Sequence, residues 1–256
     1  MFKEHGKSYT DDEMILRAWD REMIQDTMGR FVLYWGNGER RRGIDELWVQ
    51  KKQNQNTASW ATNIGFYVGI DEVVRHFVQE YEDRQYAVLQ EFEAAFPEQY
   101  SSRDLGMGLT AMHSSATPVV YIADDGQTAR YLGYDLGMSG RGHADGTAEC
   151  FHEFALFLCE LIKEDGQWKI WHFVEEHDFS IPSGVDYNEI PTVITDPEDA
   201  SRKDFGDPTI RRDVYDDQFG WEYLYYDMPV PYKTYEEEEG YGPNGKVGKK
   251  YYERHI

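Results

Sequence analysis

Residues 165–179 read DGQWKIWHFVEEHDF, and the rest of the chain is arranged around this predicted hairpin. Asp165-Gly166 is a tight-turn signal that stands between two runs of strand-favouring residues, Thr147–Ile162 and Trp168–Val174. These runs predict a long antiparallel hairpin whose aromatic and aliphatic side chains pair across the two strands.

Two histidines of this hairpin are expected on apolar faces of the sheet. Because strand side chains alternate with period two, His172 shares a face with Ile170 and Val174. By the same rule His152 shares a face with Leu156. One such histidine is usually a satisfied core residue, but two of them, joined by a third from elsewhere, would form a chemical pocket.

The composition restricts the class of protein. A chain of 256 residues, 40% of them hydrophobic, can bury one domain and carry an extension. A formal charge of −22 excludes nucleic acid and anionic membrane surfaces as partners. No apolar run is long enough to span a membrane, and the polar N-terminus shows no signal peptide. Cys150 and Cys159 are expected as free thiols in a cytoplasmic protein.

Upstream of the hairpin, helices precede strands. Thr10–Glu13 is a capping box, and the apolar spacing that follows predicts a helix up to Gly36. A short helix follows, then a strand and turn, then a long helix that begins at Gly69 and ends before Pro97. The predicted strands lie near residues 109–123, 128–136, 147–163 and 167–179, with a turn at 137–146. This order predicts an α+β domain whose curved antiparallel sheet wraps around helices and leaves a cone open at one end.

Several segments resemble the nuclear transport factor 2-like (SnoaL-like) superfamily. The first helix ends in FVLYW (31–35), the second reads IDELW (44–48), and HSSATPVVYIADDGQTAR (113–130) precedes the closing hairpin. The resemblance implies a cone-shaped barrel within residues 1–180. The superfamily includes scytalone dehydratase, bile-acid dehydratase, ketosteroid isomerase, polyketide cyclases and a diarylpropane lyase, besides members that only bind ligands, so fold alone does not give function.

The resemblance also indicates site residues. In the dehydratase relatives, a tyrosine near the end of the first helix and a strand histidine face the cone, and Tyr34 and His113 match them. His172 completes the predicted catalytic set. The aspartate that follows the tyrosine in those relatives is replaced by Trp35-Gly-Asn-Gly-Glu39. The residues expected to bind substrate are Tyr134, His152, Trp60, Tyr67 and Arg141.

Such a set supports proton transfer, because a histidine can act as general base while a tyrosine donates to an oxygen that gains charge. This chemistry suits dehydration, or retro-aldol loss of a small aldehyde, from a small hydroxylated aromatic or polycyclic compound. We expect no cofactor, since no dinucleotide or phosphate-loop motif is present. We also expect no metal, because strand alternation separates neighbours in Glu175-Glu-His177-Asp178.

Residues 181–256 form a long irregular extension. Ten aromatic residues lie between Phe219 and Tyr252, whereas disordered tails are aromatic-poor. We expect this extension to pack on its own or a neighbouring subunit of a dimeric or trimeric homo-oligomer.

Other functions also fit the sequence. A non-catalytic small-molecule binder would hold polar groups already paired with one another, and a structural protein would fill the cone with its own side chains. An isomerase or cyclase of the same fold is a further alternative to the lyase.

Overall fold

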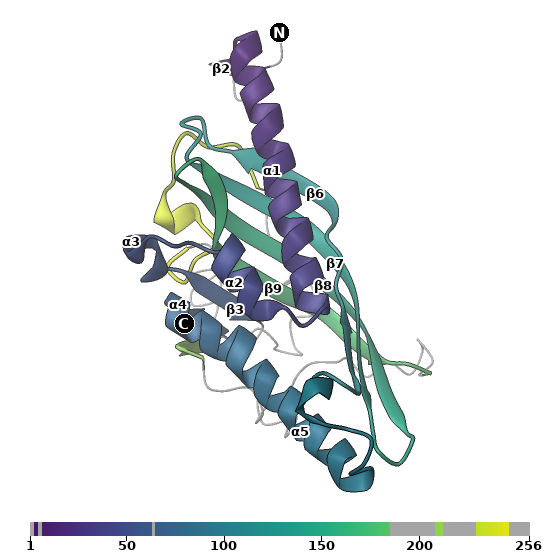
Figure 1. The fold of residues 1–256 in the computed structure, drawn as a ribbon. Coiled ribbons are helices and arrows are strands. Elements are labelled where there is room, and N and C mark those ends of the chain that lie inside the picture. The colour runs from purple at the N-terminus through teal and green to yellow at the C-terminus, as the bar shows by residue number, and fades with distance from the viewer. Residues whose placement is uncertain (1–2, 5–6, 63–64, 185–207, 212–228, 246–256) are drawn as a thin grey trace, which may run out of the picture.

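The computed structural model describes residues 3–4, 7–62, 65–184, 208–211 and 229–245. Its centre is a curved, mostly antiparallel sheet in the strand order β10-β4-β3-β9-β8-β7-β5, with β6 also paired to β7. Helices α1, α2, α4 and α5 lie over one face of this sheet, and the first turns of α1 project beyond it (Figure 1). The predicted α+β class and helix-covered curved sheet are therefore confirmed.

The first helix begins and ends where the sequence predicts. Helix α1 (Asp11–Gly36) starts with the expected capping box, in which Thr10 Oγ1 accepts from the Glu13 amide and the Glu13 carboxylate accepts from the Thr10 amide. Helices α2 (Arg40–Leu47) and α3 (Lys52–Gln55) follow. Helix α2 brings Arg40 against the end of α1, which matters for the site.

The predicted long helix after Gly69 is present, but it has an internal irregularity. It consists of α4 (Ile70–Val74), the π-helical turn η1 (Arg75–Gln79) and α5 (Glu80–Ala95). Such π turns occur often at functional sites. This one directs Phe77 into the core, where its exposed fraction is 2%.

The main strands also follow the predicted order. They are β3 (Ser59–Thr62), β4 (Gly65–Val68), β5 (Leu109–Met112), β6 (Ala116–Ile122), β7 (Thr128–Gly142), β8 (Ala148–Glu164) and β9 (Gln167–Pro182). Short pieces are β1 (Lys3–Glu4), β2 (Lys7–Ser8), η2 (Ser102–Asp104), β10 (Ile210–Arg211) and η6 (Glu237–Glu239). Strand β3 pairs with β9 in parallel, whereas the other described pairs of the main sheet are antiparallel.

The turn predicted at residues 137–146 is wrong for most of its length, because β7 continues to Gly142. The glycines there serve close strand packing. A Cβ on Gly137 would lie 3.1 Å from the Met112 carbonyl oxygen, and one on Gly140 would lie 3.2 Å from the Glu149 oxygen. Glycine therefore permits neighbouring strands to approach each other at these positions.

A β-bulge in β9 overturns the predicted face of His172. The ladder pairs Leu161 with Ile170 but Glu160 with His172, so Trp171 is an extra residue in the strand. Beyond it the alternation is reversed. Phe173 joins Ile170 in the core under the helices, while His172 points to the opposite face.

The two faces of the sheet bury different clusters. Under the helices lies a large aromatic core that includes Phe31, Trp35, Trp60, Phe157 and Phe173. The opposite face carries a smaller cluster of Ala61, Phe66, Leu132, Leu158, Val174 and Tyr241.

Part of the C-terminal extension therefore packs on this chain's own sheet. Tyr241 belongs to the smaller cluster, and the Tyr232 hydroxyl donates to Thr128 Oγ1 at 3.1 Å. The aromatics at 219–226 and 251–252 lie outside the described residues.

Within the described residues, no helix is long and apolar enough to cross a membrane. Cys150 and Cys159 are free thiols, as expected.

Candidate functional site

The site is centred on a hydrogen-bonded pair, His113 and Asp135, under the helices. His113 follows β5, and its Nδ1 lies 2.8 Å from Asp135 Oδ2 on β7. The other carboxylate oxygen accepts the Ser114 amide at 2.7 Å. Because a carboxylate can only accept, His113 Nδ1 carries the hydrogen, and Nε2 is left able to take up a proton. This is the arrangement of an oriented general base.

Aromatic rings enclose this dyad. The Trp35 ring lies over the His113 imidazole, with 3.8 Å between ring centroids and 32° between planes. Phe157 and Phe77 lie 5.9 Å and 5.2 Å from Trp35. The His113 side chain is 5% exposed and that of Asp135 is 1% exposed. Water is largely excluded, so hydrogen bonds and interactions between charges are stronger here than in solvent.

Two further ionisable residues adjoin the dyad. Glu175 on β9 is buried, and burial raises the pKa of its carboxyl to about 8, with His113 opposing and Asp135 adding to that shift. Arg40 on α2 donates to the Phe77 carbonyl at 3.1 Å, and its guanidinium lies 3.5 Å from the Tyr81 ring centroid. Burial lowers the pKa of Arg40 to about 10, which leaves it a cation at neutral pH.

Ligand-type atoms of His113, Asp135 and Glu175 lie within 4.8 Å of one another, and no other such group occurs among the described residues. This spacing is within the reach of a divalent cation. In this structure His113 Nδ1 and Asp135 Oδ2 hydrogen-bond each other, and burial raises the pKa of Glu175 to about 8. Groups of this kind at this spacing can also exchange protons.

Four buried N–H groups around the aromatic core have no hydrogen-bond partner among the described residues. They are Trp35 Nε1, Trp48 Nε1, Trp60 Nε1 and Arg40 Nε. The rings of Trp35 and Trp60 are 5.2 Å apart, and the Arg40 guanidinium is 5.5 Å from the Trp35 ring. Buried donors without partners are rare, and a bound oxygen-bearing molecule would satisfy them.

Of the three predicted catalytic residues, the structure places only His113 in this site. The Tyr34 hydroxyl donates to Glu46 at 2.8 Å on the outer side of α1 and α2, among Arg30 and Arg42. Phe31 and Trp35, one helical turn apart, fill the core instead. The expectation that Tyr34 faces the cone on the stripe of Phe31 is therefore wrong.

His172 also lies outside the site, because the bulge in β9 places its side chain on the opposite face of the sheet from His113. Its Nδ1 bonds the Ser59 hydroxyl at 2.8 Å, and a Cβ on Gly242 would lie 3.0 Å from its Cε1. Burial alone lowers the pKa of His172 to about 3, so the imidazole is neutral.

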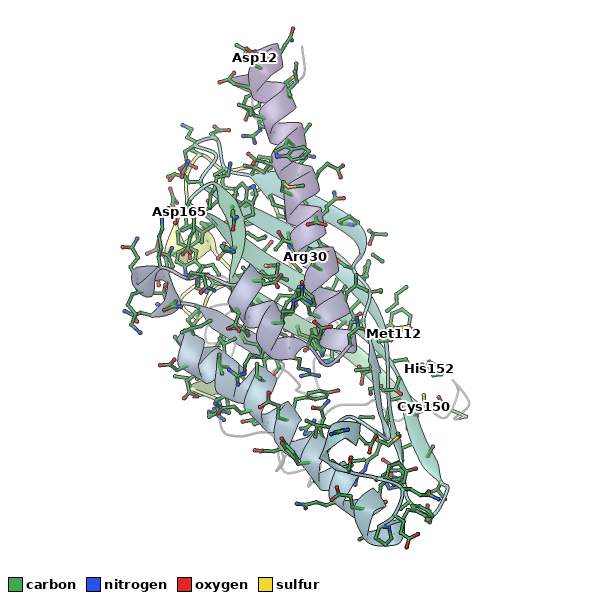
Figure 2. The ribbon with its side chains drawn as sticks, viewed as in Figure 1. Asp12, Arg30, Met112, Cys150, His152 and Asp165 are labelled. Carbon is green, nitrogen blue, oxygen red and sulfur yellow. The ribbon has the colours of Figure 1, made fainter. Side chains whose placement is uncertain are left out.

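The predicted substrate-binding residues are dispersed. Tyr134 is 48% exposed, because Asp135 takes the inward position of that pair. His152 is exposed at the margin of the sheet and contacts Ser183 Oγ at 3.1 Å (Figure 2). Trp60 is buried in the aromatic core, the one residue of these five that lies beside Trp35. Tyr67 is fully buried and stacks on His76 with 3.8 Å between centroids.

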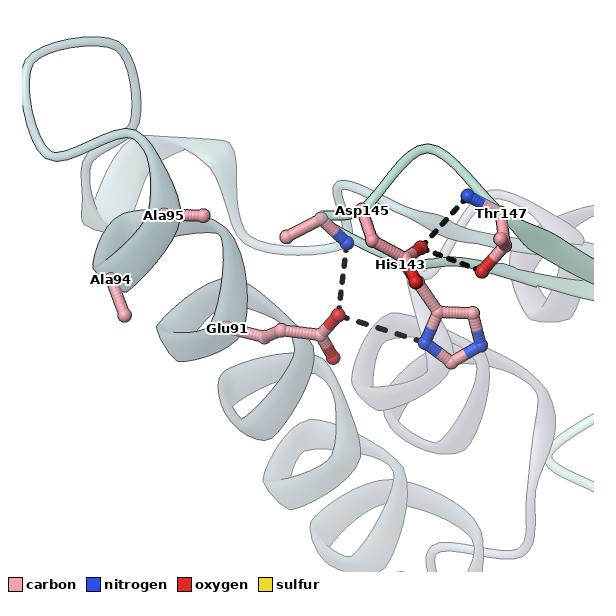
Figure 3. Close-up of a pocket in the computed structure, with 7 residues that line it drawn as sticks. Glu91, Ala94, Ala95, His143, Asp145 and Thr147 are labelled. Carbon is pink, nitrogen blue, oxygen red and sulfur yellow. Dashed lines mark hydrogen bonds and ion pairs between the residues drawn. The ribbon is translucent and has the colours of Figure 1, made fainter.

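Arg141 donates to Glu91, which lines a separate surface hollow of about 690 Å³ between the end of α5 and the tip of the β7–β8 hairpin (Figure 3). Glu91 joins these elements: it accepts from Arg141 at 3.0 Å and from the Ala144 amide at 2.9 Å, and it faces His143. His143 is eight residues beyond Asp135 on an extended strand, so roughly 26 Å separate this hollow from the dyad.

Sequence reasoning missed Asp135, Glu175, Trp35 and Arg40 as members of the site. One usable signal existed, since Asp135 has the same strand parity as Tyr131, a core residue. The contribution of Arg40 depends on how α2 packs, which no local pattern indicates.

The sequence profile of the SnoaL-like domain matches residues 17–174, and the chain belongs to this family. No curated protein matches the sequence. Similar solved structures include hexachlorocyclohexane dehydrochlorinase LinA-type3 from Novosphingobium barchaimii, with 14% identity and TM-score 0.44 over 67% of this chain and 95% of that one. An NTF2-like protein with a cystatin-like fold from Novosphingobium aromaticivorans gives 13% identity and TM-score 0.43, over 74% of this chain and 99% of the other. At these values the neighbours carry no argument about function, which rests on the site.

Proposed function

We propose that this protein is a cofactor-independent lyase that removes water, or a small aldehyde, from a small hydroxylated aromatic or polycyclic compound. The observation that carries the proposal is the His113–Asp135 pair, at 2.8 Å and shielded by the Trp35 ring. His113 Nε2 takes a proton from the substrate, and Asp135 stabilises the resulting imidazolium. A positioned base of this kind contributes about 10²–10⁴-fold in rate.

Binding of an aromatic substrate is supported by the surroundings of the pair. The rings of Trp35, Trp60 and Phe157 offer stacking surfaces, and the unpaired N–H groups of Trp35 and Trp60 suit substrate oxygens. Buried Arg40 supplies positive charge for an oxygen that gains electron density. The proposal also includes a cytoplasmic location and assembly as a homodimer or homotrimer, which the site geometry does not address.

The second function is non-catalytic binding of the same class of molecule. It is favoured by one observation, namely that His113 and Asp135 already satisfy each other. An isomerase or cyclase of the same fold would use the same base without releasing a fragment.

A ligand screen followed by product analysis separates these functions. Phenolic, lignin-derived and steroid-like compounds are first ranked by thermal shift, and each hit is incubated with wild type, His113→Ala and His152→Ala. A lyase gives products lighter by water or an aldehyde with wild type and with the His152 control, but not with His113→Ala. Unchanged compounds recovered from every stabilised sample would establish the binder, and products of unchanged mass would establish the isomerase or cyclase.

A further inference from the structure

Glu175 is a buried carboxyl that the base of the proposed reaction does not require. It lies on β9 two residues after Phe173, on the face covered by the helices, and its residue is 5% exposed. One of its carboxylate oxygens lies within 4.8 Å of ligand-type atoms of both His113 and Asp135. The Glu175 carboxyl and the His113 imidazole therefore adjoin each other, and a molecule bound beside both could exchange protons with each.

Charged groups on several elements act on Glu175, in addition to His177 on its own strand. Asp135 on β7 and Glu153 on β8 disfavour its ionised form, while His113 and Arg40 favour it. Burial outweighs all four and raises the pKa of Glu175 to about 8. At neutral pH this residue is a carboxylic acid that can donate a proton, whereas His113 beside it is built to accept one.

His177 connects this carboxyl with the surface. Its Nε2 lies 3.3 Å from Glu175 Oε1, and its side chain is 32% exposed, compared with 6% for Glu175. The two residues are two apart in a strand and share one face. His113, Glu175 and His177 thus form a row of proton-carrying groups that runs from the enclosed base towards solvent.

We propose that Glu175 is the general acid that protonates the leaving oxygen and that His177 returns the proton to it. This rests on the lyase proposed above and assigns the second half of its reaction. In dehydration, His113 Nε2 takes the proton from the carbon next to the one that bears the hydroxyl. The C–H electron pair forms the C=C bond, the C–O bond breaks, and its oxygen takes the Glu175 proton to leave as water.

The cycle closes without a co-reactant. His113 then carries one extra proton and Glu175 lacks one, so a single transfer between them, or exchange through His177 with solvent, restores both. Two adjacent groups whose surroundings separate their proton affinities are the recurring basis of acid–base pairs in enzymes.

The protonation state can be tested without a substrate. Infrared difference spectra of the full chain between pH 6 and pH 10 should show loss of a protonated-carboxyl C=O band. The band should be absent from Glu175→Gln and retained in Glu153→Gln, a matched change in the neighbouring carboxyl. A spectrum without the band in wild type, or one in which Glu175→Gln retains it, would overturn the proposal.

The acid role is tested with two leaving groups. The probes are 3-hydroxy-1,3-diphenylpropan-1-one and its 3-chloro analogue, which yield the same enone by loss of water or of chloride. Chloride needs no proton to leave. Glu175→Gln should therefore lower turnover of the hydroxy compound by about 10²-fold or more and leave the chloro compound within about threefold.

The other outcomes are distinct. Equal losses on both compounds would make Glu175 structural and overturn the acid role, while His113→Ala inactivity would still support the lyase. Turnover of neither compound by wild type would contradict the lyase itself. For His177→Ala, turnover that is lowered and then restored by added imidazole supports proton return. Turnover that is unchanged and insensitive to imidazole overturns that role.

Discussion

His113 and His172 are both buried imidazoles on one sheet, and the structure gives them opposite surroundings. His113 bonds the carboxylate of Asp135 on the helix-covered face, whereas His172 bonds the hydroxyl of Ser59 on the other face. A carboxylate compensates the charge of an imidazolium, but a hydroxyl does not. Burial alone lowers the pKa of His172 to about 3, and this imidazole cannot work as a base near neutral pH. The two histidines therefore differ in the partner that each ring holds, and only His113 lies beside a carboxylate.

Removing the hydrogen-bond partner of each histidine should have the largest effect on turnover at one site and on stability at the other. Asp135→Asn keeps the shape of the side chain but removes the compensating charge, so we expect turnover to fall by about 10²–10⁴-fold. Ser59→Ala should leave turnover within about threefold and lower the free energy of unfolding by about 1–3 kcal/mol, because it leaves a buried ring nitrogen without a partner. Steady-state kinetics and urea titrations of both variants measure this. Equal losses of turnover would remove the distinction.

The free energy of unfolding should depend on pH between roughly 4.3 and about 8 because of Glu175. Its carboxyl has a pKa of about 8 in the folded chain, compared with roughly 4.3 when unfolded. Between these values the folded state holds a proton that the unfolded state has released. The free energy of unfolding therefore falls as pH rises through this window, by several kcal/mol relative to Glu175→Gln. Urea unfolding at pH 5, 7 and 9 checks it, and parallel curves for both proteins would contradict the shift.

Below about pH 6.5, His172 should lower the free energy of unfolding as the pH falls. Its pKa is about 3 when folded and roughly 6.5 when unfolded, so only the unfolded chain takes up a proton between these values. Stability is fully present above pH 6.5 and is lost as pH falls, on the order of 3 kcal/mol by pH 4. His172→Gln should lack this part of the loss. If both proteins lose stability equally between pH 6.5 and pH 4, the imidazole is not held neutral.

The smallest effect is expected at Tyr34. Its hydroxyl bonds the half-exposed Glu46 carboxylate outside the aromatic core. Tyr34→Phe should change turnover by less than about threefold and stability by less than about 1 kcal/mol, as for other exposed charged contacts. A loss of turnover near 10²-fold would place this hydroxyl in the reaction after all.

Much of the fold could be predicted because local signals and the hydrophobic pattern agree. The capping box at Thr10 and the turn at Asp165-Gly166 fix where a helix begins and where the hairpin reverses. The glycines of β7 predicted a turn, because glycine is common in turns. In the structure they permit neighbouring strands to pack closely.

The site was less predictable, because it depends on which of two neighbouring residues faces inward. The alternatives are adjacent residues, Tyr34 and Trp35 in the helix and Tyr134 and Asp135 in the strand. The hydrophobic pattern does not indicate which residue of each pair faces the core. The bulge at Trp171 reverses the alternation by inserting one residue, which has no signature in composition. His113 was identified through the family resemblance, whereas its partner depends on a contact between β5 and β7.

We propose that His113 and Asp135 act as one unit, and a double-mutant cycle in turnover distinguishes this from two independent roles. His113→Ala, Asp135→Asn and the double variant are compared with wild type on 3-hydroxy-1,3-diphenylpropan-1-one, with folding checked by circular dichroism. If the carboxylate acts only through the imidazole, the double variant will lose no more than His113→Ala alone. Losses that multiply, so that the double variant equals the product of the two single effects, would contradict the account.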